Sequence, residues 1–203
     1  MDKTVKTKDS KTEMVEIDYS KTEATVCFLI RNGTVLLVEK GRNIGQGKLV
    51  GVGGRQEEGE TLEETAEREV QEEIGVIVKS MKKAAELDFI FPHNPKFSQR
   101  VTAYVVEVWE GEPQPTDEAK TTRWFKMNEL PVERMWHDNT IWLPLVLSGK
   151  TVNGRFVIDK NDRVTEYSLE EIEVMAKSTG FEIVENILDN KGYFTNSIWR
   201  RSH

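Results

Sequence analysis

The feature that most constrains this 203-residue chain is a helix whose two ends can both be read from the sequence. Thr61 and Glu64 form a capping box, in which each side chain accepts a hydrogen bond from the other residue's backbone N–H. Gly75 supplies the stop, since glycine readily adopts the left-handed conformation that ends helices. We therefore predict a helix from about Leu62 to Ile74.

One face of this helix mixes apolar and acidic residues. At 100° per residue, the apolar stripe consists of Leu62, Ala66, Val70 and Ile74. Glu69 and Glu73 fall among these positions, and Glu72 borders them. Inward carboxylates are unfavourable unless a cation or a donor meets them. Three carboxylates at this spacing suit a hard divalent ion such as Mg2+, and Arg68 can steady Glu72 at i+4. The alternative is a solvated acidic helix, which we accept for Glu63, Glu64 and Glu67.

The stretch Gly54 to Val76 reads GRQEEGETLEETAEREVQEEIGV. It fits the pattern G-x5-E-x7-R-E-U-x-E-E-x-G-U, with U aliphatic, and this resembles the signature of the Nudix hydrolases. Members of that superfamily cleave nucleoside diphosphates linked to another group. The resemblance implies an α/β/α sandwich (α+β class) with a mixed sheet, and a loop-helix-loop catalytic unit. It also implies Mg2+ as cofactor, with Mn2+ as a substitute.

The resemblance assigns roles around the helix. The metal ligands would be the Gly53 carbonyl, Glu69, Glu72 and Glu73, with Arg68 positioning the cluster. The glycines at 51, 53 and 54 let the backbone approach a metal or phosphate, although alone they would indicate only a turn. The expected substrate contacts of this segment are Val52, Gly53, Gly54 and Arg55.

Segments outside the helix narrow the resemblance to the 8-oxo-dGTP diphosphatases, over about Ala24 to Tyr167. The segments are Arg42 to Gly54, Trp124-Phe125, Met135 to Asn139 and Trp142 to Leu145. In that family a Trp stacks on the purine and two following acidic residues contact the base edge. The matching positions here are Trp136, Asp138 and Asn139.

These residue types suit a 6-oxopurine. Asp138 can accept from N1–H and the 2-amino group, and the Asn139 amide can donate to O6. We expect Asn139 to favour 6-oxopurines over oxidised adenine nucleotides. The alternatives are a core or rim aromatic for Trp136 and a loop-capping role for the other two.

Other positions are less specific. Thr25 and Lys40 match family positions that line the pocket, but a strand hydroxyl and a surface lysine are alternatives. Val50 stands where the family commonly has an Asn that touches the base. A further acid, as metal ligand or base, is expected before Trp124. Glu118 is our candidate, with Asp117 as competitor and a solvated loop as the alternative.

Composition bounds the partners. The net charge of −7 argues against a general nucleic-acid binder, which would show a basic face, but not against a nucleotide substrate. Cys27 is the only cysteine, and we expect a buried thiol. No signal peptide or membrane span is visible, so we expect a cytoplasmic protein without membrane partners. We expect a monomer or a homodimer.

Three parts are expected: a flexible tail over 1–22, a Nudix domain over 23–165 and a helix-strand extension over 166–203. In the tail, alternating Val15, Ile17 and Tyr19 could form an edge strand. An Asn32-Gly33 turn predicts a hairpin in the domain. The other strands expected there are 48–52, 76–80, 83–90, 99–108 and 123–126. In the extension we expect a helix from a capping box at 168–171 to about 177, a strand over 181–188 and a hairpin at 190–192.

The implied reaction is Mg2+-dependent hydrolysis of oxidised purine nucleoside triphosphates, such as 8-oxo-dGTP, to the monophosphate and pyrophosphate. This would clear the nucleotide pool and prevent DNA damage. A Nudix enzyme for a nucleotide sugar, dinucleotide, capped RNA end or methylated purine triphosphate is one alternative. A non-catalytic Nudix scaffold is another, against which the intact acids count.

Overall fold

The computed structural model describes residues 23–42 and 45–172 in full, together with the backbone of six short strands outside them. The helices are α1 (Leu62–Ile74) and α2 (Asn139–Leu147), with 3-10 turns at Pro95–Phe97 and Val132–Arg134. The main strands are β3 (Glu23–Arg31), β4 (Thr34–Lys40), β5 (Leu49–Val50), β6 (Ile77–Ile90), β7 (Gln99–Glu110), β8 (Ala119–Lys126), β9 (Thr151–Ile158) and β10 (Val164–Ile172). The short outer strands are β1 (Thr4–Lys8), β2 (Met14–Asp18), β11 (Phe181–Glu182), β12 (Asn186–Leu188), β13 (Phe194–Thr195) and β14 (Arg200–Arg201).

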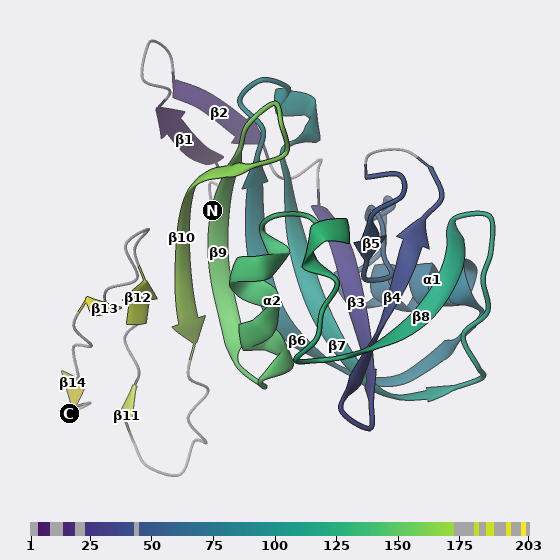
Figure 1. Cartoon of the computed structure of the whole chain (residues 1–203). Coiled ribbons are helices and arrows are strands. Elements are labelled where there is room, and N and C mark those ends of the chain that lie inside the picture. The colour runs from purple at the N-terminus through teal and green to yellow at the C-terminus, as the bar shows by residue number, and fades with distance from the viewer. Residues whose placement is uncertain are drawn as a thin grey trace.

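The main sheet is mixed. Its order is β13-β12-β10-β9-β6-β7-β3-β4-β5, with β8 paired to β4. The pairs β3–β7 and β6–β9 are parallel, and the other pairs are antiparallel. The two helices cover opposite faces of this sheet, with α2 in front and α1 behind in Figure 1. This is the α/β/α arrangement that the resemblance to the Nudix hydrolases implied.

Successive residues of β3 serve the two faces, because side chains alternate along a strand. Phe28 belongs to the core under α2, where its ring meets Trp142 edge-on at 5.8 Å. Cys27 and Leu29 belong to the core under α1, together with Val70. The predicted burial of the Cys27 thiol is confirmed, since it is 0% exposed.

The local predictions for α1 are confirmed. Both hydrogen bonds of the capping box are present, with Thr61 as N-cap and Glu64 at N3. Gly75 ends the helix in the left-handed conformation, at φ 71° and ψ 20°. The Asn32-Gly33 hairpin also forms, with positive φ at both residues as a type I′ turn requires.

The predicted helix beginning at Ser168 is wrong where the structure describes it. Residues 168–172 lie in β10, antiparallel to β9, and Leu169 is only 1% exposed. Sheet pairing and burial of alternate residues have overridden the local capping signal. The remainder of that helix, 173–177, lies outside the described residues. Strand β10 also continues through the position between 165 and 166 where we expected the domain to end.

Several strands differ in extent or partner from the predictions. The two strands expected over 76–80 and 83–90 are one strand, β6, interrupted by irregularities in its pairing with β7. Strand β9 was not predicted at all. The strand expected around Val15 and Ile17 exists as β2, but it pairs with β1 and not with the edge of the main sheet.

At the other terminus, β12 and β13 form the predicted hairpin, although its connecting residues lie outside the described part. In the expected run 181–188 the described strands are 181–182 and 186–188. Neither α1 nor α2, the helices of the described part, has the length and apolar character needed to cross a bilayer.

Candidate active site

A cavity of about 940 Å³ gathers most of the predicted site residues. Those that line it are Thr25, Lys40, Gly53, Gly54, Arg55, Glu69, Glu73, Glu118, Trp136, Asp138 and Asn139. We call the part formed by Gly53, Gly54, Glu69 and Glu73 the acidic half. The aromatic half is the part formed by Trp136, Asp138, Asn139 and the neighbouring Phe side chains.

In the acidic half, backbone without side chains lies directly against two carboxylates. A Cβ on Gly54 would fall 2.4 Å from Glu69 Oε1, and one on Gly53 would fall 2.2 Å from the Thr25 carbonyl oxygen. The Gly53 N–H donates to Glu73 Oε2 at 3.4 Å. The glycines are therefore needed for the loop to reach the helix face that carries the acids.

Glu73 is held in an unfavourable state for a carboxylate. Glu73 is only 6% exposed to solvent. Burial raises the pKa of Glu73 to about 7, and the charge of Glu69 adds to the rise, whereas Lys40 and Arg42 oppose it. A cation beside Glu73 would relieve this desolvation penalty.

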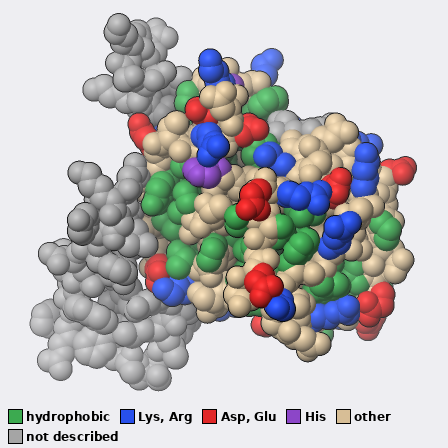
Figure 2. Space-filling view, viewed as in Figure 1, with side chains coloured by type: hydrophobic (Ala, Val, Ile, Leu, Met, Phe, Trp, Pro, Cys, Tyr) green, Lys and Arg blue, Asp and Glu red, His purple; other side chains and the backbone are tan. Residues whose placement is uncertain are grey.

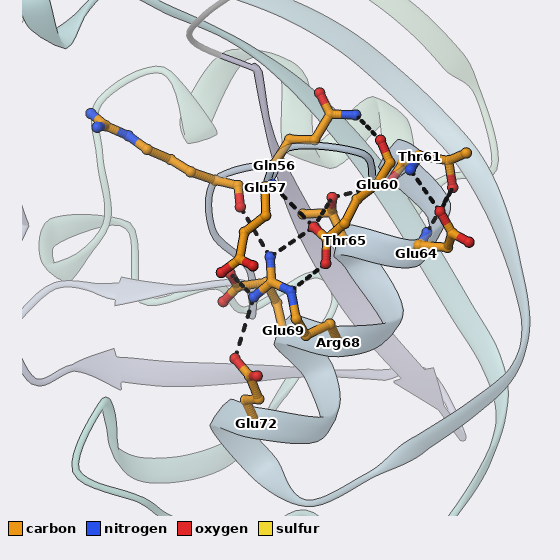
Figure 3. A network of polar contacts seen from close by, with 10 residues as sticks. Gln56, Glu57, Glu60, Thr61, Glu64, Thr65, Arg68, Glu69 and Glu72 are labelled. Carbon is orange, nitrogen blue, oxygen red and sulfur yellow. Dashed lines mark hydrogen bonds and ion pairs between the residues drawn. The ribbon is translucent and has the colours of Figure 1, made fainter.

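Arg68 joins the loop before α1 to the helix (Figure 3). Its guanidinium donates to both carboxylate oxygens of Glu60, at 2.7 and 3.0 Å, to Glu69 at 2.8 Å and to the Arg55 carbonyl at 3.1 Å. The predicted contact with Glu72 is present at 3.3 Å. Hydrogen bonds from Arg68 lower the pKa of Glu60 to about 2. Arg68 does not line the cavity, and its contacts join the loop to the carboxylate of Glu69.

The three predicted acids do not all enter the cavity. Glu69 and Glu73 line it, but the Glu72 side chain is 63% exposed and turns to Arg68. Within residues 23–42 and 45–172, no three carboxylate, His or Cys side chains lie close enough together to hold a metal ion. The two carboxylates that do converge, Glu69 and Glu73, offer oxygen ligands, and this chemistry fits a hard divalent cation.

Three other predicted residues have distinct positions. Glu118, and not its competitor Asp117, lines the cavity, where it pairs with Arg42. Thr25 is 3% exposed, and its hydroxyl has no hydrogen-bond partner in the described structure. Val52 does not line the cavity: it is 0% exposed, and its backbone bonds to Cys27 in both directions.

The aromatic half holds a buried acid beside an indole. Asp138 is 5% exposed and accepts a hydrogen bond from Trp142 Nε1 at 2.9 Å. Burial raises the pKa of Asp138 to about 6, although Trp142 and the nearby charges of His137 and Lys48 oppose the rise. Asp138 precedes α2, but its side chain makes no capping hydrogen bond. The buried carboxylate therefore lines the cavity without capping α2.

Sequence reasoning missed most of the apolar lining. The missed apolar residues include Phe28, Phe89, Phe91, Phe97, Trp142 and Ile158, and the amide side chain of Gln99 was also missed. The alternation of Leu87, Phe89 and Phe91 could have placed Leu87 and Phe89 on one face of β6, with Phe91 directly after the strand on the same side. No comparable sequence pattern predicts that Gln99 or Ile158 lines the cavity. Their positions there depend on the order of β7 and β9 in the sheet.

Comparison with known proteins identifies the family. Residues 21–146 match the family model of the NUDIX domain. This chain belongs to the Nudix family. It is 35% identical over 149 residues to an oxidized purine nucleoside triphosphate hydrolase of Danio rerio, and 32% identical to that of Mus musculus. Each match covers 73% of this chain and 94% of the relative. A NAD-capped RNA hydrolase NudC of Chromobacterium violaceum is 31% identical, over 57% of this chain and 42% of that protein.

Solved Nudix structures share the fold. The MutT protein of Bacillus halodurans superposes with a TM-score of 0.63 at 24% identity, over 73% of this chain and 97% of that one. A NUDIX hydrolase of Nitrosomonas europaea gives a TM-score of 0.54 at 20% identity, over 77% and 94% of the two chains. This Nudix protein is accordingly a hydrolase that acts on nucleotide phosphoanhydrides. Nudix hydrolases generally use divalent metal ions.

Proposed function

We propose that this Nudix hydrolase converts oxidised purine nucleoside triphosphates, such as 8-oxo-dGTP, to the monophosphate and pyrophosphate. The observation that carries the proposal is one cavity that holds Glu69 and Glu73 at one part and Trp136 beside the buried Asp138 at another. The activity would remove damaged nucleotides from the pool before DNA synthesis.

The aromatic half supplies the groups that a 6-oxopurine requires. The Trp136 indole offers a stacking platform. Asp138, when ionised, accepts from N1–H and the 2-amino group, while the Asn139 amide donates to O6. These polar groups lie in a buried site, where an unmet donor or acceptor is strongly unfavourable, and this disfavours bases with another edge pattern.

The acidic half supplies the hydrolytic groups. Glu69, Glu73 and the Gly53 carbonyl would hold Mg2+, with Mn2+ as a substitute. Glu72 would become a further ligand only when its side chain leaves Arg68 and turns inward. When bound, such an ion neutralises phosphate charge and lowers the pKa of an attacking water. Arg68 holds Glu69 in place through its 2.8 Å contact.

Other residues that line the same cavity are candidates for the proton transfer and for the phosphates. Glu118 or one of the helix carboxylates takes the proton from the attacking water. Lys40 and Arg55, which line the cavity, meet phosphate oxygens.

A second candidate is another nucleoside diphosphate-linked substrate. Val50 lines the cavity at the position where the resembled diphosphatases commonly have an Asn that touches the base, so one polar base contact is missing. The NAD-capped RNA hydrolase among the relatives is an example of such an activity. Against an RNA substrate, charged side chains of both signs are interspersed on the face seen in Figure 2, and the net charge is −7.

A pyrophosphate-release screen with Mg2+ tests the proposal, over ordinary, oxidised and methylated purine triphosphates. Nucleotide sugars are assayed in parallel by phosphatase-coupled release of phosphate. We expect kcat/KM for 8-oxo-dGTP to exceed that for dGTP, and 2-oxo-dATP to be turned over more slowly than 8-oxo-dGTP. Turnover confined to nucleotide sugars would reject the proposed function, and equal turnover of the two oxidised nucleotides would reject the role of Asn139.

A further inference from the structure

The loop between β4 and β5 supports the Trp136 ring. Lys48 Nζ lies over this ring, 4.7 Å from its centroid. Gly45, at φ +82°, packs so closely that a Cβ there would fall 2.8 Å from Trp136 Cζ2. The Lys48 N–H donates to the Gly45 carbonyl at 2.9 Å, which closes these four residues into a tight turn. The turn therefore contacts the indole with both backbone and ammonium.

The two lysines at the ends of this loop act on different halves of the cavity, Lys40 on Glu73 and Lys48 on Trp136. Lys40 lines the cavity, and its charge acts on Glu73. Lys48 is not among the lining residues, whereas Trp136 is. The ammonium that contacts the ring thus belongs to a residue outside the cavity lining. The loop is tied across its base, because the Lys40 N–H donates to the Lys48 carbonyl at 3.0 Å.

We propose that Lys48 is a positioning residue for base recognition: its ammonium holds the Trp136 indole from outside the cavity in the orientation that stacks on a purine. A cation over an aromatic face is attracted by the ring quadrupole, so the contact resists rotation of the indole. The inference rests on the proposed function for the stacking role of Trp136, but the contact between Lys48 and Trp136 does not.

The same ammonium also bears on the acid next to the indole. The charged groups that act on Asp138 are Lys48 from this loop and His137 from its own loop, and Trp142 donates to it from α2. Both effects of Lys48 concern the base and neither concerns the phosphates. Loss of the Lys48 charge should therefore weaken substrate binding and leave the rate of the chemical step unchanged.

The first arm of the test observes the free protein. The five tryptophans are labelled as 5-fluorotryptophan, and the Trp136 resonance is assigned with Trp136→Phe. We expect Lys48→Met, which keeps the aliphatic stem, to shift or broaden the Trp136 fluorine resonance. Lys48→Arg should restore the resonance, and Lys82→Met, at an exposed site on β6, should leave it unchanged. An unchanged resonance in Lys48→Met would overturn the proposal. Thermal melts of each variant confirm that it is folded.

The second arm uses 8-oxo-dGTP as substrate. We expect Lys48→Met to raise KM roughly 5-fold with kcat within 2-fold, and Lys48→Arg to return KM to the wild-type value. Inhibition by the nucleoside 8-oxo-2′-deoxyguanosine should weaken by the same factor, and inhibition by pyrophosphate should not. Weaker pyrophosphate inhibition with unchanged nucleoside inhibition would make Lys48 a phosphate ligand and overturn the proposal. If 8-oxo-dGTP is not hydrolysed at all, the proposed function fails, and the fluorine resonance alone still decides the role of Lys48.

Discussion

The two halves of the cavity are assembled in different ways. The acidic half comes from one continuous stretch, in which a glycine loop folds back on the helix α1 that follows it. The aromatic half draws on β3, β6, the turn at Pro95–Phe97, the loop before α2 and the start of α2, which are far apart in sequence. The hydrolytic groups thus depend on one local unit, whereas the groups around the base depend on how distant segments pack together. Variants in the two halves should therefore change different kinetic constants.

The largest effect is expected in the acidic half. Glu73→Gln removes a buried carboxylate without changing its size, so kcat should fall by on the order of 10²–10⁴. KM for 8-oxo-dGTP should stay within a few fold, because the aromatic half is untouched. Steady-state kinetics with Mg2+ measure both constants. Glu67→Gln, at an exposed position on the same helix, is the matched control and should retain full activity.

A variant in the aromatic half should change KM and leave kcat almost unchanged. Trp136→Ala removes the stacking platform, which is worth about 1–3 kcal/mol, so KM should rise roughly 10- to 100-fold. We expect kcat to change by less than a few fold, since Glu69 and Glu73 keep their positions. Trp124→Ala serves as control, because Trp124 stacks on Trp109 and does not line the cavity. A loss confined to kcat in Trp136→Ala would break the division between the halves.

A smaller effect is expected from pH. Burial raises the pKa of Asp138 to about 6, and protonation removes an acceptor that the base needs. KM should therefore rise as pH falls through 6 and stay constant above about 7. Asp138→Asn cannot titrate there, so its KM should be raised and should lose this dependence. A wild-type acid limb that persists unchanged in Asp138→Asn would assign the titration to another group.

The smallest effect concerns base choice. Asn139→Asp replaces a permanent amide donor with a group that donates only when protonated. Turnover of 2-oxo-dATP relative to 8-oxo-dGTP should rise by roughly 3- to 10-fold. Competition between the two substrates in one reaction measures this ratio directly, without an error from enzyme concentration. An unchanged ratio would remove Asn139 from the account of specificity.

The sequence predicted what is determined locally. The helix α1, both of its caps and the facing of Glu69 and Glu73 follow from residues within one short stretch. The same kind of local signal failed at Ser168, because pairing with β9 and burial of Leu169 outweigh a capping box. Propensity near a helix end is worth only about a kilocalorie per mole, and tertiary burial of a Leu is worth more.

The site, like the fold, was predictable only where its residues lie close together in sequence. Periodicity placed Glu72 beside the other acids, but it could not show that the side chain turns outward to Arg68. Phe89 and Phe91 alternate visibly at the end of β6 and just beyond it, yet only the sheet order brings them to a cavity shared with Trp136. Contacts made through parallel pairing, such as β3 with β7, have no short-range signal in the chain.

Binding by a hydrolytically inert variant tests the separation of the two halves most directly. The measurement is the dissociation constant of 8-oxo-dGTP for Glu73→Gln with Mg2+, by calorimetry, with and without Trp136→Ala in the same chain. We predict that Glu73→Gln alone binds 8-oxo-dGTP with a dissociation constant near the wild-type KM, and that the added Trp136→Ala weakens binding roughly 10- to 100-fold. Loss of binding in Glu73→Gln alone, or equal affinity of the single and double variants, would contradict the account.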